Sequence, residues 1–265
     1  MDFKNVRLVV SDMDGTLLNS RHELDPDFYN VYRKLKSKGI IFAAASGRQY
    51  HNIRNVFSPI RSEIYFISEN GGYVVHQEKD LHVQEMEPAL TYSLIEDAKT
   101  IEGTFTILCG KKKAYIEDST SFFVEHLRRY YDEYEIVEDL LRVTDDQFLK
   151  IAICDTSGAE KNAFNLFRTK IEHLQVKVSG DIWLDISHKL ANKGVALKKV
   201  QKLLSITPDE TVVFGDYLND LEMMEQAYYS FAMENAHPEV KKVSRYVARS
   251  NDEAGVLEIL RKIAQ

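Results

Sequence analysis

Hydrophobic positions in the first 72 residues alternate between short continuous runs and runs at helical spacing. The continuous runs are rich in β-branched and small apolar residues, which is typical of strands buried on both faces of a parallel sheet. The runs at helical spacing predict amphipathic helices, and Gly39 ends the first of them. The expected strands are 7–15, 40–48 and 63–72, and the expected helices are 26–38 and 50–56. Strands and helices in this alternation indicate a doubly wound α/β sheet.

The pattern changes from residue 73 to residue 187, where strands come in pairs separated by helices. The expected strands are 73–77, 80–86, 104–110, 113–119, 148–155, 176–180 and 183–187, and the expected helices are 88–101, 121–134 and 159–174. Paired strands of this kind favour an α+β module with an antiparallel sheet. We place this module at about 85–187, inserted into the first domain.

The doubly wound pattern resumes after the module. The expected helices are 193–204, 220–227 and 252–264, and the expected strands are 211–216, 228–233 and 245–249. The predicted fold class is therefore α/β, with a mostly parallel, Rossmann-like core sheet formed by 1–84 and 188–265. The inserted α+β domain at 85–187 is the second domain.

Composition and charge limit the kinds of partner. The chain has 265 residues, of which 44% are hydrophobic and 28% charged, as in an ordinary globular protein. With 41 acidic and 34 basic residues, the net charge is −7. Such a surface has no general attraction for nucleic acid or anionic lipid, so we expect neither as a partner. A small anionic substrate would need a local positive centre, which a lysine, an arginine or a metal ion can supply.

Cysteine content and the apolar runs bear on the compartment. Cys109 and Cys154 lie inside apolar runs and are expected to be buried free thiols. Residues 1–7 are polar and the apolar stretch after them is short, so we expect no signal peptide. We also expect no membrane span and a cytoplasmic location. A monomer and a dimer are equally compatible with the sequence.

The first motif with chemical potential is SDMDGTLL, in which Asp12 and Asp14 follow an apolar strand. Residues two apart on an extended backbone face the same side, so both carboxylates can serve one site. One can attack phosphorus while the other passes a proton to the departing oxygen. Gly15 permits a sharp turn out of the strand. The alternative is a solvated acidic turn.

A calcium-binding loop is a further alternative for this segment. A loop of the EF-hand type beginning at Asp12 would place Glu23 where its last ligand is needed. Leu17, however, occupies the position that requires glycine, and the preceding segment is a strand rather than a helix. The calcium loop is therefore disfavoured.

Two weaker motifs could hold phosphate. Ser46, Gly47 and Arg48 follow the second predicted strand, where a hydroxyl, backbone N–H groups and a guanidinium suit phosphate oxygens. The alternative is an ordinary cap on the next helix. Lys193 begins a predicted helix, where the helix dipole disfavours a cation, so an anion nearby is expected. The alternative is a solvated lysine.

The fourth motif is VVFGDYLNDLEMM, an apolar strand followed by Gly215, Asp216, Asn219 and Asp220. Several oxygen ligands in one loop suit Mg²⁺, which binds few protein carboxylates together with water and phosphate oxygens. The alternative is an acidic loop that caps the next helix. In open α/β sheets, ligands bind beyond the carboxyl ends of strands, and this is where these motifs lie.

Taken together and in this order, the four motifs resemble those of the haloacid dehalogenase superfamily of phosphohydrolases. The closest resemblance is to its Cof-type branch, whose large α/β cap of the C2B type is inserted between the second and third motifs. The resemblance implies a Mg²⁺-dependent phosphatase that hydrolyses small phosphate monoesters. Sugar phosphates are the expected substrates, and flavin mononucleotide or pyridoxal phosphate are possible ones.

The resemblance also implies a role for each residue. Asp12 is the expected nucleophile, which forms an aspartyl-phosphate, and Asp14 the acid and then the base. Lys193 neutralises charge beside the nucleophile. The residues implied to bind phosphate are Ser46, Gly47, Arg48 and Lys193. Those implied to hold the metal are Asp12, Asp14 through its backbone carbonyl, Asp216, Asn219 and Asp220.

Other functions remain open at this point. A phosphosugar mutase of the same superfamily would use the same aspartyl-phosphate. A non-catalytic sensor of phosphorylated metabolites is disfavoured, because such a protein would be expected to lack Asp12, Asp14 or Lys193. A receiver domain is disfavoured because it lacks the second aspartate and the insertion.

Overall fold

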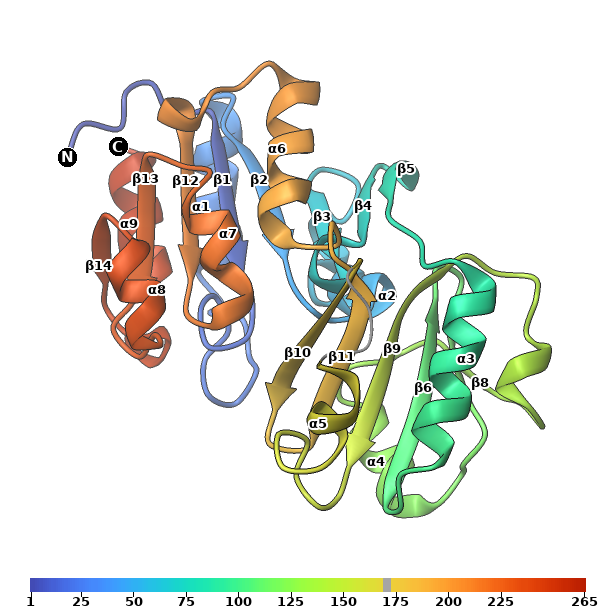
Figure 1. Cartoon of the computed structure of the whole chain (residues 1–265). Helices are drawn as coiled ribbons and strands as arrows, with labels where there is room; N and C mark the ends of the chain where they lie inside the picture. The colour runs from blue at the N-terminus through green and yellow to red at the C-terminus, as the bar shows by residue number, and fades with distance from the viewer. Residues whose placement is uncertain (169–172) are drawn as a thin grey trace. The chain divides into compact units, whose positions relative to one another are not determined.

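The computed structural model describes residues 1–168 and 173–265 (Figure 1). These residues form two compact units. The first unit comprises 1–47, 53–82 and 192–265, and the second comprises 48–52 and 83–191. A role in substrate specificity for an inserted domain at 85–187 stays a prediction.

An eight-stranded sheet runs through the first unit, in the order β14-β13-β12-β1-β2-β3-β4-β5. The strands from β14 to β3 are parallel, and β4 is antiparallel to β3. Its strands are β1 (Leu8–Asp12), β2 (Ile41–Ala45), β3 (Tyr65–Ser68), β4 (Tyr73–His76), β5 (Lys79–Val83), β12 (Thr211–Gly215), β13 (Tyr229–Met233) and β14 (Tyr246–Ala248). The predicted mostly parallel α/β core is confirmed.

Helices cover this sheet in two groups (Figure 1). Helices α6, α7 and α8 pack side by side, whereas α1 packs beside α9. Helix α1 buries Phe28 and Leu35, as its periodicity predicted, and the Phe28 ring meets Phe42 of β2 edge-on. The helices are α1 (Phe28–Ser37), α2 (Tyr50–Val56), α6 (Lys193–Leu204), α7 (Leu221–Met224), α8 (Pro238–Val243) and α9 (Gly255–Ile263).

The strand order reverses at β1. From β1 the chain proceeds to β2 and β3 on one side, and the later strands β12, β13 and β14 lie on the other. At such a reversal the connections leave in opposite directions, which opens a crevice beyond the carboxyl ends of the two central strands. Asp12 is the last residue of β1, and Asp216 directly follows β12. The topology therefore brings the first and fourth motifs to the same place.

The second unit contains a six-stranded sheet in the order β10-β11-β9-β6-β7-β8. Its pairings are antiparallel except for β7 with β8. Side chains alternate along β9: Ile151 and Ile153 pack with α3 and α5, whereas Ala152 and Cys154 pack with α4. The elements are α3 (Pro88–Lys99), β6 (Thr104–Gly110), β7 (Ala114–Ile116), α4 (Ser121–Leu127), β8 (Tyr134–Ile136), β9 (Phe148–Asp155), α5 (Ala163–Phe167), β10 (Leu174–Gly180) and β11 (Trp183–His188). Both cysteines are buried free thiols, as predicted.

Two helices predicted for this region are wrong in extent. The helix predicted at 121–134 ends at Leu127. Tyr134 begins β8 instead and pairs with Ala114 of β7, so the chain must leave the helix before this strand. The predicted helix 159–174 is helical only at 163–167, and Leu174 begins β10, while 169–172 lie outside the described residues. Asp155 explains the late start, since its carboxylate accepts the N–H of Ser157 (3.0 Å) and of Ala163 (2.9 Å) and holds the intervening chain as a loop.

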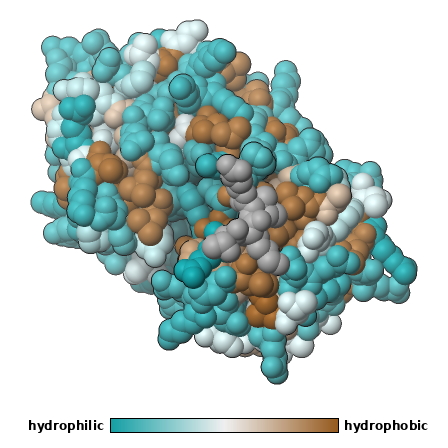
Figure 2. Space-filling view, in the orientation of Figure 1, coloured by the Kyte–Doolittle hydropathy of each residue, from teal (hydrophilic) through white to brown (hydrophobic). Residues whose placement is uncertain are grey.

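The surface is mainly hydrophilic on the face drawn in Figure 2, where hydrophobic residues form separate patches. The large apolar side chains that are exposed include Ile136, Leu203 and Val247, which come from different elements. Scattered apolar residues of this kind are normal on a globular surface. Within 1–168 and 173–265, no helix combines the length and the apolar character that crossing a membrane requires.

Candidate active site

Four of the predicted site residues meet at the carboxyl ends of β1 and β12. Asp12, Asp216 and Asp220 each present a carboxylate oxygen, and these oxygens lie within 4.8 Å of one another. Lys193 is fully buried, and its ammonium donates to Asp12 Oδ1 and, at 2.7 Å, to Asp220 Oδ1. A single lysine thus links the strand-end aspartate of the first motif to the loop of the fourth.

Lys193 lies at the position where the helix dipole is least favourable for a cation. It is the first residue of α6, and the two carboxylates supply the anion that this position requires. Burial alone would lower the pKa of Lys193, but the charges of Asp12 and Asp220 raise it above its usual range. Lys193 is therefore charged throughout the physiological pH range.

The cluster carries more negative charge than Lys193 can offset. When all three carboxylates are ionised, the ammonium of Lys193 leaves the cluster with a net charge of −2. Burial, followed by the charge of Asp220, raises the pKa of Asp216 to about 7. Burial also raises the pKa of Asp12, although the ammonium of Lys193 opposes this shift. A divalent cation would balance this charge, and carboxylate oxygens are suitable ligands for a hard cation, so the residues present fit such an ion.

The loop after β12 is organised by Asp220. Its Oδ2 accepts the backbone N–H groups of Asp216 (2.9 Å) and Tyr217 (3.2 Å), while its Oδ1 accepts from Lys193. Gly215 allows the carboxylate to fold back in this way, because a Cβ there would lie 2.7 Å from the Asp220 carboxyl group. Both oxygens of Asp220 are thus already engaged by protein donors.

The turn after β1 lies against Asp216. Gly15 has a φ of +75°, and a Cβ at this position would overlap the Asp216 carboxylate. The Thr16 hydroxyl donates to Asp216 Oδ1 at 3.1 Å. Asp14, by contrast, does not belong to the carboxylate cluster, and its Oδ1 lies 2.9 Å from Nδ1 of His22.

The second motif divides between the two units. Ser46 is buried after β2, its carbonyl accepts the N–H of Asn70 (3.0 Å), and the Asn70 amide lies against Gly47. Arg48 belongs to the second unit, where its guanidinium donates to Asn52 (2.9 Å) and lies 5.8 Å from the centre of the Tyr130 ring. The phosphate-binding roles of these three residues stay predictions.

Three residues beside the site were missed by sequence reasoning: Thr16, His22 and Asn70. Asn70 has a left-handed backbone (φ +54°), and its Oδ1 accepts from Asn219 Nδ2 at 3.0 Å. It follows the carboxyl end of β3, so the rule that located the other motifs could also have found it. Thr16 and His22 carry no comparable signal, since only the folded loop shows their partners.

The topology, with aspartates at the ends of β1 and β12 and a buried lysine between them, defines the class of protein. The chain belongs to the haloacid dehalogenase-like hydrolase family, whose model matches residues 9–260. The predicted resemblance to this superfamily is confirmed, and so is the prediction of a phosphatase.

Individual relatives cover nearly the whole chain. The 5-amino-6-(5-phospho-D-ribitylamino)uracil phosphatase YbjI of Escherichia coli (strain K12) is 33% identical over 268 residues, covering 98% of this chain and 96% of the relative. Phosphatase YwpJ of Bacillus subtilis (strain 168) is 25% identical over 284 residues, covering 97% of this chain and all (100%) of the relative. The crystal structure of SMU.1108c from Streptococcus mutans UA159 is similar with a TM-score of 0.89 and 29% identity, covering 97% of this chain and 98% of that one.

Proposed function

We propose that the protein is a Mg²⁺-dependent phosphatase that hydrolyses small phosphate monoesters through an aspartyl-phosphate on Asp12. The observation that carries this proposal is the buried network of Asp12, Lys193 and Asp220 beside Asp216. A carboxylate nucleophile can approach an anionic ester only where positive charge is already in place, and Lys193 supplies it within hydrogen-bonding contact of Asp12.

The chemistry divides between the two aspartates of the first motif. A carboxylate oxygen of Asp12 attacks phosphorus, and the bond from phosphorus to the alcohol oxygen breaks as Asp14 passes a proton to that oxygen. In the second half, Asp14 takes a proton from water, the water oxygen bonds to phosphorus, and the bond from Asp12 to phosphorus breaks. Asp14 lies outside the buried carboxylate cluster and its side chain is partly exposed, so it can exchange its proton with solvent.

Asp12 and Asp216 are the side chains we propose as metal ligands, with the backbone carbonyl of Asp14. When bound, Mg²⁺ neutralises charge that spreads over the transferring phosphoryl oxygens. Asp220 acts differently in this proposal, because Lys193 and two backbone N–H groups already occupy its oxygens. It holds the lysine and the loop, and Asn219 supports the loop through Asn70.

The substrates we propose are phosphate esters of small metabolites, with sugar phosphates first. Flavin mononucleotide and pyridoxal phosphate carry the same primary alkyl phosphate. The 33% identical relative is named for a ribityl phosphate attached to a pyrimidine. The panel of test substrates should therefore vary the group that carries the phosphate, from sugars and sugar alcohols to the hydroxymethyl group of pyridoxal.

The test is phosphate release from a panel of monoesters by the purified protein. The panel contains hexose and pentose phosphates, flavin mononucleotide, pyridoxal phosphate and the ribitylamino-uracil phosphate. We expect release that needs added Mg²⁺ and stops when EDTA is present. Formation of an isomeric phosphosugar without free phosphate would favour the mutase instead. No reaction with any ester would reject the proposed function.

The binding of Mg²⁺ is expected to weaken below pH 7. The pKa of Asp216 is raised to about 7 in the metal-free protein, so at pH 6 the ion must displace a proton. The affinity should fall by up to about tenfold per pH unit in this range. Isothermal titration calorimetry in buffers of different ionisation enthalpy should show proton release at pH 6 and little at pH 8.5. Asp216→Asn is the control, and it should bind weakly with a smaller pH dependence, because Asp12 is then the proposed side-chain ligand whose raised pKa remains. Equal affinity at both pH values would contradict the prediction.

A further inference from the structure

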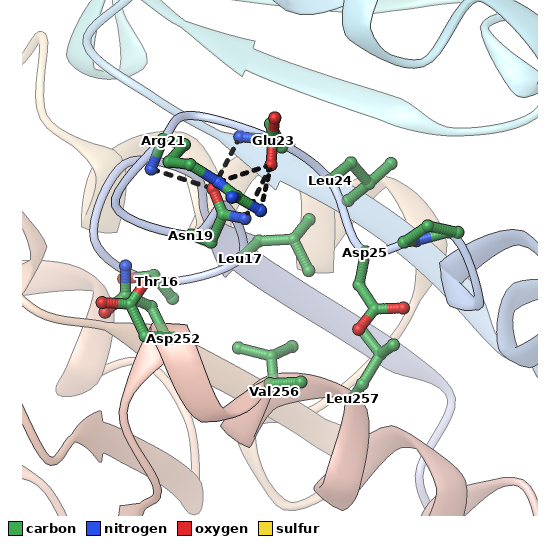
Figure 3. Close-up of a pocket in the computed structure, with 13 residues that line it drawn as sticks. Thr16, Leu17, Asn19, Arg21, Glu23, Leu24, Asp25, Asp252, Val256 and Leu257 are labelled. Atoms are coloured by element: carbon green, nitrogen blue, oxygen red, sulfur yellow. Dashed lines mark hydrogen bonds and ion pairs between the residues drawn. The ribbon is translucent and has the colours of Figure 1, made fainter.

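Residues 19–23 form a closed turn beside the first motif, built around the side chain of Asn19 (Figure 3). Its Oδ1 accepts the backbone N–H of Arg21 (2.9 Å) and of Glu23 (3.0 Å). The backbone N–H of Asn19 donates to the carbonyl of Glu23 (3.1 Å), and that of His22 donates to the carbonyl of Asn19 (2.8 Å). An asparagine that bonds the following backbone in this way specifies one turn conformation.

The same turn is tied to the rest of the first unit. The N–H of Ser20 donates to Asp252 at 2.7 Å, and the Asn251 amide donates to the carbonyl of Leu18 at 3.0 Å. Between the turn and the start of α9 lies a pocket of about 480 Å³, with Leu17 and Val256 among the residues that line it (Figure 3). The N-terminal end of the turn is therefore held in place by Asn251 and Asp252, although most of the side chains of the turn are exposed.

His22 is the residue that this turn presents to the first motif. It has a φ of +61°, a left-handed conformation that is uncommon outside glycine. This conformation accompanies the contact of its ring with Asp14, in which Nδ1 lies 2.9 Å from Oδ1. An ionised carboxylate only accepts hydrogen bonds, so Nδ1 carries the hydrogen in that state.

We propose that His22 is a positioning residue for the acid and base steps of Asp14, an inference that rests on the proposed function. While Nδ1 of His22 keeps this hydrogen, Oδ1 remains an acceptor, so a proton that Asp14 takes up sits on Oδ2, and rotation of the carboxyl group is restricted. The side chain of Asp14 is 34% exposed, so water would compete for Oδ1 in the absence of His22. Fixed orientation of the proton donor accelerates transfer to the leaving oxygen.

This role predicts a dependence on the leaving group. An alkyl phosphate releases a strongly basic alkoxide, which must be protonated as the bond breaks. p-Nitrophenyl phosphate releases a weakly basic phenolate, which departs with little help from an acid. Loss of His22 should therefore reduce kcat/KM for the alkyl ester about tenfold more than for the aryl ester, the size of effect expected from one hydrogen bond. Because kcat/KM reports only steps up to the first irreversible one, the later use of Asp14 as a base does not obscure the comparison.

His22→Gly is the variant of choice, because glycine adopts the left-handed conformation without strain and removes the imidazole together with its Cβ. His22→Asn should recover part of the loss, since asparagine tolerates this conformation and keeps an N–H donor. Arg21→Ala is the matched control from the same turn, where Arg21 pairs with Glu23 at the surface. This control should leave both rates close to wild type.

The outcomes separate the proposal from the function on which it rests. In an Asp14→Asn background, His22→Gly should cause no further selective loss on the alkyl ester. Equal losses on the two esters, or a selective loss that persists without Asp14, would overturn the positioning role. Wild-type protein that releases phosphate from neither ester would instead reject the proposed phosphatase.

Discussion

Asp12→Asn is expected to abolish phosphate release, lowering kcat by roughly 10⁴-fold or more, the scale seen when a covalent nucleophile is removed. The amide has nearly the same shape as the carboxylate but cannot attack phosphorus. Lys193 keeps its second partner, Asp220, in this variant, so the buried lysine is not left alone. The loss should therefore appear in kcat on every substrate of the panel, with the fold retained.

Two measurements distinguish lost chemistry from lost structure. The melting temperature of metal-free Asp12→Asn at pH 8 should equal or exceed that of wild type, because one of three clustered carboxylates has become neutral. Asp14→Asn is the complementary variant. It should still accept phosphate from p-nitrophenyl phosphate but release it slowly, so that a phosphorylated protein accumulates and is seen by intact mass spectrometry. Substantial phosphate release by Asp12→Asn would show that another group is the nucleophile.

The core of the fold follows from the sequence because its signals are local. Continuous apolar runs identified β1, β2 and β12, and periodicity together with a glycine identified α1. The predicted helix at Lys193–Leu204 matches α6 at both ends. Each of these elements buries the residues that its apolar pattern marks, so tertiary context agrees with local preference.

The second unit was predicted less well because tertiary pairing decides its structure. The sequence pattern before Tyr134 predicts a helix, yet Tyr134 belongs to the edge strand β8, which pairs with β7. The carboxylate of Asp155 holds the following loop by bonds that reach Ala163, and no periodicity reveals them. Where the local preferences for helix and for strand are of similar size, such long-range contacts decide which of the two forms.

In the candidate site, too, local sequence patterns located some residues, whereas only the fold determines their contacts. Asp12 and Asp216 could be located because each follows an apolar strand, and strand ends in a doubly wound sheet converge. The helix dipole indicated that Lys193 needs an anion, but which anions these are, Asp12 and Asp220, depends on the fold. The contacts of Arg48 with Asn52 and Tyr130 were equally beyond reach of the sequence.

Lys193→Met is expected to remove activity and also to destabilise the metal-free protein by about 3–5 kcal/mol at pH 8, the usual cost of leaving a buried charge without its partner. Methionine fills a similar volume, so packing changes little. The variant leaves Asp12 and Asp220 buried together with no ammonium between them. The free energy of unfolding, from denaturant titration, measures the loss.

The pH dependence of this loss tests its electrostatic origin. Burial already raises the pKa of Asp12, and without Lys193 the pKa should rise further. A carboxylate with a raised pKa takes up a proton in the folded state at a pH where the unfolded chain remains ionised. The destabilisation caused by its buried charge is therefore present at high pH and disappears as pH falls. The destabilisation should therefore shrink between pH 8 and pH 5. Lys193→Met combined with Asp220→Asn should recover stability at pH 8 without recovering activity. A loss of stability that is the same at both pH values would show that Lys193 acts through packing rather than charge.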